Sequence, residues 1–256
     1  MTVTDLHTDT VVEEVMAALH TVTDPELDEP ITDLGFVRSV TVDDTGVEVH
    51  LRLPTAFCSP NFAYLMASDA VDALRCVDDA GEVRVLLDDH HDSEKINAGL
   101  AADAGYVGTF GVEAQDSLDE LRLTFLRKAH TAAMERCVTS LIRNGLDDSS
   151  IHHLTLRDLP DGREKSALLR RRLALGLSLC RNSRVLVGED GAQLAPDAVP
   201  MRLRFARSVR ISMEGNGHFC RGLLATRYDG DIGGGEHLPT IIDIRTRVRG
   251  RAILVP

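Results

Sequence analysis

The first hundred residues alternate between helical and strand-like spacing of apolar positions. Apolar side chains recur every three to four residues over 10–20, which predicts a helix. Apolar and polar residues alternate over 36–42 and 47–53, and the DDTG between them predicts the turn of a β-hairpin. A second helix is expected from Pro60 to about residue 77, and a third strand over 82–87. This order predicts a small α+β domain, taken as residues 1–98.

The rest of the chain has mainly helical patterns. A Gly/Ala-rich stretch over 99–115 is only weakly patterned and is interpreted as a linker. The longest helical pattern covers 116–144 and meets a stop signal at Gly145, and a shorter helix is expected over 164–175. Residues 183–194 look like two short strands around a turn, and EGNG at 214–217 is a turn by composition. The predicted second domain, 116–256, is therefore mainly helical with a few short strands, and its tail beyond 228 is either partly disordered or an edge strand.

Charge is distributed unevenly along the chain. Residues 1–100 hold 21 of the 40 acidic residues but 5 of the 28 basic ones, so the second half is slightly basic. The acidic half would repel phosphates, and the arginine-rich half lacks interleaved aromatic residues, so no nucleic-acid partner is expected. No apolar run reaches the ~18 residues of a membrane span. The N-terminus lacks the basic and apolar regions of a signal peptide, so the expected compartment is the cytoplasm.

One cysteine, Cys58, stands where a predicted strand passes into a predicted helix, in the stretch LPTAFCSPN. Pro60 suits the first position of a helix, and Ser59 before it suits the N-cap. Free backbone N–H groups at such a helix start favour an anion or a thiolate. The alternative is that Cys58 is a small, half-buried apolar residue. The five cysteines include no CxxC pair, and their odd number argues against a disulfide framework.

Other side chains of metal-ligand type form two groups. Asp24 and Glu26 flank Pro25 in a polar turn, where they are either solvated or presented near the cysteine loop. In the second half, three such residues lie within seven positions, and they are candidates either for a metal site or for a plain glycine turn with a buried cysteine: Glu214, His218 and Cys220.

Two further groups have an ordinary and a functional interpretation. His90 and His91 follow the third strand, and because adjacent side chains point in opposite directions, at most one is expected to share a site with Cys58. The ordinary interpretation of this pair is a solvated polar turn. Arg170–Arg172 form either a solvated basic face or a docking surface for an acidic partner, including the acidic N-terminal domain itself.

The order of these features resembles a known family. DPEL, then DLGFVRSVTV, then a strand that ends in a T-x-x-C loop before a helix, is similar to the iron–sulfur-assembly domain of the SufT and PaaD type, over about residues 10–90. The resemblance implies that Cys58 is the residue most tied to function and that Asp24 and Glu26 form the family's acidic turn. Members help to mature metalloproteins and are not known as conventional enzymes.

A longer resemblance extends over about residues 10–228. The same domain, then HHDSEKINAGL, then an arginine-rich part ending in SMEGNG-x-x-CRGLL-x-x-RY, is similar to metal–sulfur cluster assembly factors encoded beside bacterial multicomponent diiron monooxygenases. This implies a client, the diiron hydroxylase, rather than an activity.

The leading hypothesis is therefore a maturation factor that holds iron or an iron–sulfur cluster transiently. Cys58 would be one ligand, with Asp24 or Glu26 nearby. Further ligands would come from a second copy in a homodimer, from the stretch 214–220, or from the client. The alternative is a metal-free folding and assembly chaperone for the hydroxylase subunits. An enzyme is not expected, because the chain has no G-x-S-x-G elbow, no Walker loop and no G-x-G-x-x-G after a strand.

Overall fold

A computed structural model of the chain describes residues 3–114, 118–228 and 238–245. It is α+β, with helices and strands in the first half and a mainly helical second half, as the sequence predicted. The contacts divide the chain into two compact units. Unit 1 comprises Met1–Asp24, Glu29–Gln115 and Cys220–Pro256; unit 2 comprises Pro25–Asp28 and Asp116–Phe219.

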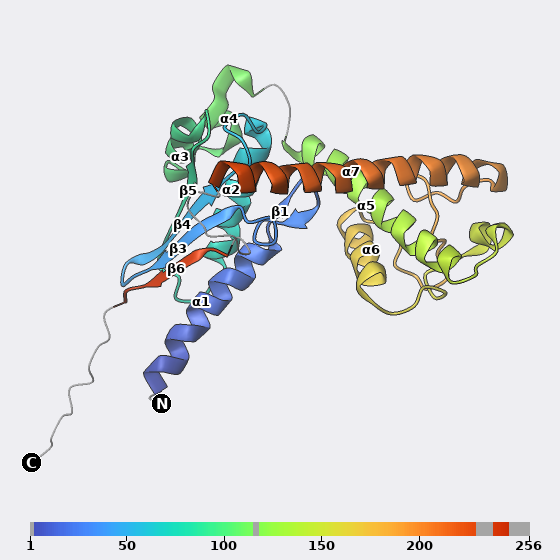
Figure 1. Ribbon diagram of the computed structural model, residues 1–256, viewed down its shortest axis with the longest axis horizontal. Helices are drawn as coiled ribbons and strands as arrows, with labels where there is room; N and C mark the ends of the chain where they lie inside the picture. The colour runs from blue at the N-terminus through green and yellow to red at the C-terminus, as the bar shows by residue number, and fades with distance from the viewer. Residues whose placement is uncertain (1–2, 115–117, 229–237, 246–256) are drawn as a thin grey trace, which may run out of the picture. The chain divides into compact units, whose positions relative to one another are not determined.

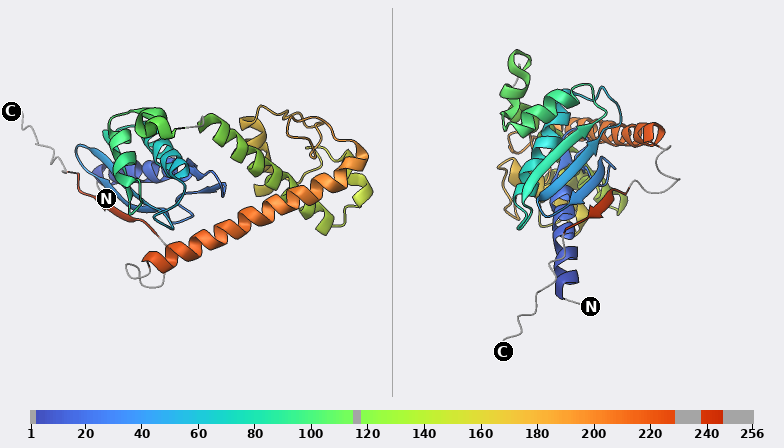
Figure 2. Two further views of the ribbon diagram at one scale, coloured as in Figure 1. Left: turned by 90° about the horizontal axis from the view of Figure 1, so that it is seen from above. Right: turned by 90° about the vertical axis from the view of Figure 1, so that its left-hand side faces the viewer.

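Unit 1 is built around a four-stranded sheet in the order β5-β4-β3-β6 (Figure 1). β3 (Val37–Val42) and β4 (Gly46–Arg52) form the predicted antiparallel hairpin, with Asp43 accepting the backbone N–H of Thr45 in its turn. β5 (Glu82–Asp88) runs parallel to β4 on one side, and β6 (Thr240–Asp243) runs parallel to β3 on the other. Figure 2 shows β6 in red at the edge of the sheet, where an edge strand was one of the two expectations for the tail.

Helices cover this sheet because each has a row of apolar residues. α1 (Val3–Thr21) packs on α2 (Pro60–Arg75), and α2 packs on β5. The alternating residues of β4 all point to the core, where Val47, Val49 and Leu51 are at most 2% exposed. Leu19 of α1 and Leu74 of α2 are fully buried in the same unit.

The stretch expected to be a linker is helical for most of its length. It contains the end of α3 (Ser93–Ala101), all of α4 (Gly105–Phe110) and the 3₁₀ turn η1 (Gly111–Glu113). Aromatic packing helps to hold this segment in its helical form, because the rings of Tyr106 and Phe110 pack on each other and on Tyr64 of α2. The two units also differ from the predicted domains, because 25–28 joins unit 2 and the segment after 219 joins unit 1. The domain limits themselves stay a prediction.

Unit 2 is built on three helices: α5 (Leu118–Arg143), α6 (Arg163–Ala174) and α7 (Val199–Tyr228), of which the residues up to Phe219 belong to this unit. Met134 and Val138 of α5 pack with Leu168 of α6 in its core. The 3₁₀ turns η2 (Asp148–His153) and η3 (Pro196–Ala198) join the helices, and the Asp147 side chain caps η2 by accepting the backbone N–H of Ser149.

Two turn and strand predictions for this half are wrong. Residues 183–194 make isolated bridges, Thr155 with Arg184 and Val187 with Gln193, instead of two strands. EGNG lies inside α7, so it is helix and no turn. Among the described residues, no helix is long and apolar enough to cross a membrane.

Candidate functional site

The loop that carries Cys58 joins β4 to α2, as predicted. Ser59 occupies the N-cap position with φ −53° and ψ 126°, and Pro60 is the first helical residue, although the Ser59 side chain makes no capping hydrogen bond. Cys58 is neither fully buried nor fully exposed. Its neighbour Phe57 is 81% exposed at the tip of the loop.

The thiol of Cys58 has a hydroxyl beside it. Thr55 Oγ1 lies 3.5 Å from Cys58 Sγ, and the same hydroxyl accepts the backbone N–H of Phe57 at 3.2 Å. Because that N–H occupies an acceptor position of the oxygen, the hydroxyl hydrogen is available to donate to sulfur. The T-x-x-C spacing of the sequence therefore has a structural reason: it closes a small turn around the thiol.

His90 fixes the backbone of this loop. Its ring is 6% exposed, and Nε2 lies 2.8 Å from the carbonyl oxygen of Cys58, while Nδ1 accepts the N–H of Asp92 at 3.1 Å. This pattern assigns the neutral tautomer with hydrogen on Nε2. Both ring nitrogens are thus engaged, and His90 positions Cys58 through its carbonyl group. The interpretation of 90–91 as a solvated turn is wrong for His90.

His91 meets the loop in a different way. Its backbone N–H donates to the carbonyl of Ala56 at 2.8 Å, and its exposed ring lies 5.9 Å from the ring of Phe57. One of the two histidines therefore contacts Cys58 through its ring, and the other supports the exposed tip.

Arg227, which the sequence did not single out, also holds the start of the loop, and an arginine–tyrosine pair packs beside it. Arg227 Nη1, from the end of α7 within unit 1, donates to the carbonyl of Leu53 at 3.1 Å, and Nη2 donates to the carbonyl of Asp89 at 2.5 Å. Arg52 is 3% exposed, and its guanidinium lies 5.0 Å from the ring centre of Tyr228. The only sequence signal for this arrangement was the R-Y pair that closes the longer resemblance.

The two carboxylates of the acidic turn, Asp24 and Glu26, belong to different units. Asp24 is 7% exposed and ends β1 (Thr23–Asp24), which pairs with β2 (Glu29–Pro30) in unit 1. Glu26 belongs to unit 2, where its Oε1 accepts from the side-chain amide of Asn216 at 3.2 Å. The two carboxylates that flank Pro25 thus have separate structural surroundings, and their roles as ligands stay a prediction.

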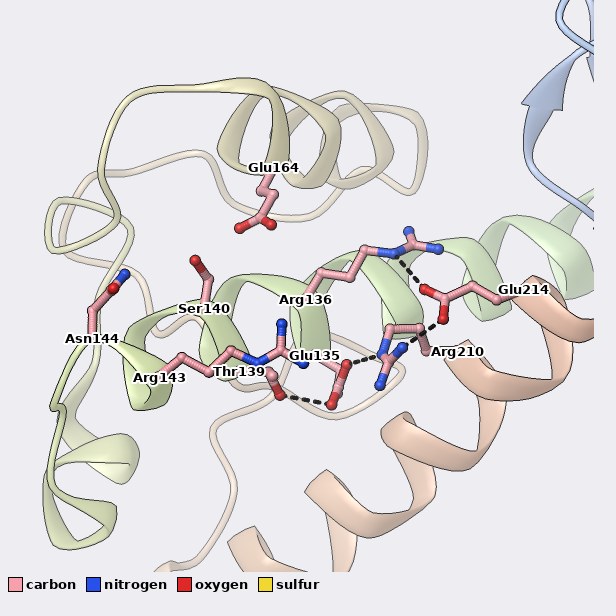
Figure 3. A pocket seen from close by; sticks show the side chains of 9 residues that line it. All are labelled: Glu135, Arg136, Thr139, Ser140, Arg143, Asn144, Glu164, Arg210 and Glu214. Carbon is pink, nitrogen blue, oxygen red and sulfur yellow. Dashed lines mark hydrogen bonds and ion pairs between the residues drawn. The ribbon is translucent and has the colours of Figure 1, made fainter.

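The second group of candidate ligands lies on a helix. The wrong turn prediction matters here, because residues four apart share a helix face and residues two apart do not. Glu214 and His218 are one turn apart on α7, whereas Cys220 faces another direction. Glu214 is engaged by arginines: it accepts from Arg210 at 2.6 Å and from Arg136 at 3.5 Å (Figure 3).

The basic helix also differs from its interpretation. Of the three consecutive arginines in α6, only Arg170 is exposed. Within unit 2, Arg171 donates from Nε to Asp28 at 2.7 Å. The pKa of the Asp28 carboxyl is raised, because the effect of burial outweighs the lowering effect of the Arg171 charge. Arg172 is 1% exposed. A solvated face of three arginines is therefore wrong, because side chains one residue apart are turned by about 100° on a helix.

Within the part of the chain that the structure describes, no three His, Cys, Asp or Glu side chains form a group that could hold a metal ion. The described residues therefore do not by themselves form a closed metal site. Cys58 remains the candidate ligand with the most defined local structure.

Comparison with known proteins finds a family match that covers residue 58. Residues 12–87 match the family described as iron–sulfur cluster assembly protein. An uncharacterized protein of Methanocaldococcus jannaschii, MJ1129, is 35% identical over 86 residues, which are 33% of this chain and 88% of that protein. The chain belongs to this family. No solved structure matches it.

The match divides the candidate residues. Cys58, Asp24 and Glu26 lie inside the matched segment, whereas the α7 residues 214–220 and the arginines of α6 lie outside it. Membership supports a general role in iron–sulfur cluster assembly, and it rests on residues 12–87, most of which form the sheet and helices of unit 1.

Proposed function

We propose that the protein carries iron or an iron–sulfur cluster transiently on the Cys58 thiolate and passes it to a client protein. The observation that carries this proposal is the loop itself. Its backbone is held at Cys58 by His90 and at Leu53 by Arg227, while the thiol is partly exposed beside an exposed Phe57. A fixed backbone with an accessible thiolate is suited to receiving and releasing a metal ion.

The number of ligands favours transfer over storage. Structural metal sites and iron–sulfur clusters normally have four protein ligands. In this proposal Cys58 provides one of them, the carboxylate of Asp24 in the same unit adds another, and the rest come from a second copy or from the client. The client is proposed to be the hydroxylase of a diiron monooxygenase, on the basis of the resemblance over residues 10–228.

The test compares two cysteine variants. Cys58→Ser removes the proposed ligand, and Cys76→Ser is the matched control, because Cys76 is an exposed cysteine that follows the end of α2 in the same unit. Each protein is purified without oxygen, and its iron, sulfide and visible absorption are measured after reconstitution. We expect iron uptake to fall strongly in Cys58→Ser and to stay unchanged in Cys76→Ser. Equal iron and sulfide in all three proteins would refute the role of Cys58.

A metal-free chaperone is the second candidate, and exposed Phe57 favours it. A side chain of this size that is 81% exposed is suited to docking on an apolar surface. If the protein only binds an apo-hydroxylase, co-purification will survive Cys58→Ser and be lost in Phe57→Ser. If it delivers metal, both variants will leave the co-produced hydroxylase short of iron.

A further inference from the structure

Unit 2 contains an arginine that is buried without a carboxylate. Arg172 in the last turn of α6 is 1% exposed, and its Nη2 donates to the carbonyl of Arg184 at 2.7 Å. Its Nε and Nη1 are buried, and the described residues provide no hydrogen-bond partner for either atom. Burial lowers the pKa of Arg172, and no acidic neighbour opposes this effect. A buried charge that lacks a counter-charge is costly, so such a group calls for a partner.

A cavity of about 440 Å³ lies at this arginine. Its walls come from Thr155 after η2, from the end of α6 and from the segment between α6 and η3, and the bridges of Thr155 with Arg184 and of Val187 with Gln193 hold them together. The residues that line it include two charged side chains, both arginines, and no carboxylate: Thr155, Arg172, Leu177, Ser178, Asn182, Ser183, Arg184, Val187, Gly191 and Gln193. The lining of this cavity is therefore positive and rich in hydrogen-bond donors.

Neutral donors surround the two arginines. Ser178 and Ser183 hydroxyl oxygens are 2.7 Å apart, and the backbone N–H of Cys180 donates to Ser178. Their mutual bond uses one of the two hydroxyl hydrogens, so the other is available to a ligand. The side-chain amides of Asn182 and Gln193 add further donors to the same lining.

An acidic group that interacts with Arg184 does not neutralise the cavity. Asp158 interacts electrostatically with Arg184, but its Oδ2 already accepts the backbone N–H of Thr155 at 2.8 Å and the Thr155 hydroxyl at 2.6 Å. Asp158 does not line the cavity. Arg184 also donates from Nη1 to the carbonyl of His153, so only part of its guanidinium group is left for the cavity, whereas Arg172 faces no carboxylate.

We propose that this cavity binds a small oxyanion of the phosphate class, either free or as a group on a small molecule. A tetrahedral oxyanion accepts hydrogen bonds in several directions, which suits a lining with two guanidinium groups, hydroxyls and amides. A carboxylate offers two oxygens in one plane and would leave more of these donors unused. The site lies in unit 2 and does not depend on Cys58.

The test uses the full chain and inorganic phosphate. Thermal unfolding is followed against phosphate concentration at constant ionic strength, set with chloride, because a ligand that binds the folded state stabilises it by RT ln(1 + [L]/Kd). Acetate in place of phosphate distinguishes a carboxylate site. The expected result is a saturable rise in melting temperature with phosphate and a smaller rise, or none, with acetate.

Two arginine variants localise the effect. Arg184→Gln removes a charge that lines the cavity. Arg181→Gln is the control, because Arg181 lies in the same segment but is exposed and does not line the cavity. Arg184→Gln is expected to weaken phosphate binding on the order of tenfold, the loss of a charged hydrogen bond, and Arg181→Gln to leave it unchanged. Ser183→Ala is a second, milder test with a smaller loss. No saturable phosphate effect in the wild type, equal loss in both arginine variants, or an acetate response as strong as that to phosphate would overturn the proposal.

Discussion

His130 should make unit 2 sensitive to acid. Its side chain on α5 is 2% exposed, and its Nε2 has no hydrogen-bond partner among the described residues. Burial, together with the positive charges of Arg172, Arg202 and Arg171, lowers the pKa of His130 from 6.5 to about 4. The folded protein therefore holds this imidazole neutral at pH values where the unfolded chain protonates it.

The direction and size of the effect follow from the two pKa values. Between pH 6.5 and about pH 4 the unfolded chain binds a proton that the folded chain does not, so the free energy of unfolding falls as the pH falls. The slope is about 1.4 kcal/mol per pH unit, and the whole window amounts to roughly 3 kcal/mol. Above pH 6.5 the contribution is fully present, and below about pH 4 both states carry the proton and no more is lost.

The assay is urea unfolding at several pH values for the wild type and His130→Gln. Carboxylates titrate in the same range, so the difference between the two proteins is the quantity that isolates His130. Far-UV circular dichroism follows both units, whereas tyrosine fluorescence follows unit 1, because the chain has no Trp and its three tyrosines, Tyr64, Tyr106 and Tyr228, lie in unit 1. Buffers without phosphate avoid stabilisation through the proposed oxyanion site.

We expect the wild type to lose stability faster than His130→Gln on acidification, with parallel curves above pH 7. Curves that stay parallel from pH 7 to pH 4.5 would refute the reasoning, because they would show that His130 binds its proton equally in both states.

The loop and the sheet of unit 1 provide two further predictions, both measured by urea unfolding with tyrosine fluorescence. His90→Ala removes both ring hydrogen bonds of a buried side chain and should lower the free energy of unfolding by about 2–4 kcal/mol. The control His91→Ala changes an exposed side chain and should alter the free energy of unfolding by no more than about 0.5 kcal/mol. Equal effects of the two variants would contradict the anchoring role of His90. Gly46→Ala would place a Cβ 2.0 Å from the carbonyl oxygen of Glu82, so β4 and β5 must shift, at a cost of about 1–3 kcal/mol. Gly222→Ala, on α7 with open space around it, should be neutral or stabilising, and a similar loss in both glycine variants would speak against the close approach.

Local patterns predicted those parts of unit 1 that depend on neighbouring residues in the chain. The alternation of Val47, Val49 and Leu51 determined which face of β4 is buried, and the order Ser59–Pro60 determined where α2 begins. Cys58 was identified for the same reason, since a cysteine just before a helix start is visible in the sequence.

The errors arose where distant contacts outweigh local composition. Gly215 and Gly217 indicated a turn, yet they continue α7, and the neighbouring Met213 packs with Ala129 and Ala132 of α5. The cost of glycine in a helix is about 1 kcal/mol per residue, which such packing can offset. Arg172 shows the same limit, because no local pattern distinguishes a buried arginine from its exposed neighbour Arg170.

The anchoring of the cysteine loop could not be predicted for a related reason. The side chains that hold its backbone come from widely separated positions: His90 after β5 and Arg227 near the end of α7. Neither side chain is bound to Cys58 Sγ; both engage backbone carbonyls instead. These contacts fix the position of the loop backbone. The sulfur atom itself contacts the Thr55 hydroxyl and lies next to the exposed Phe57. The proposed transfer of a metal would benefit from this separation, because a rigid backbone keeps the thiol in place during binding while the ligand set stays incomplete.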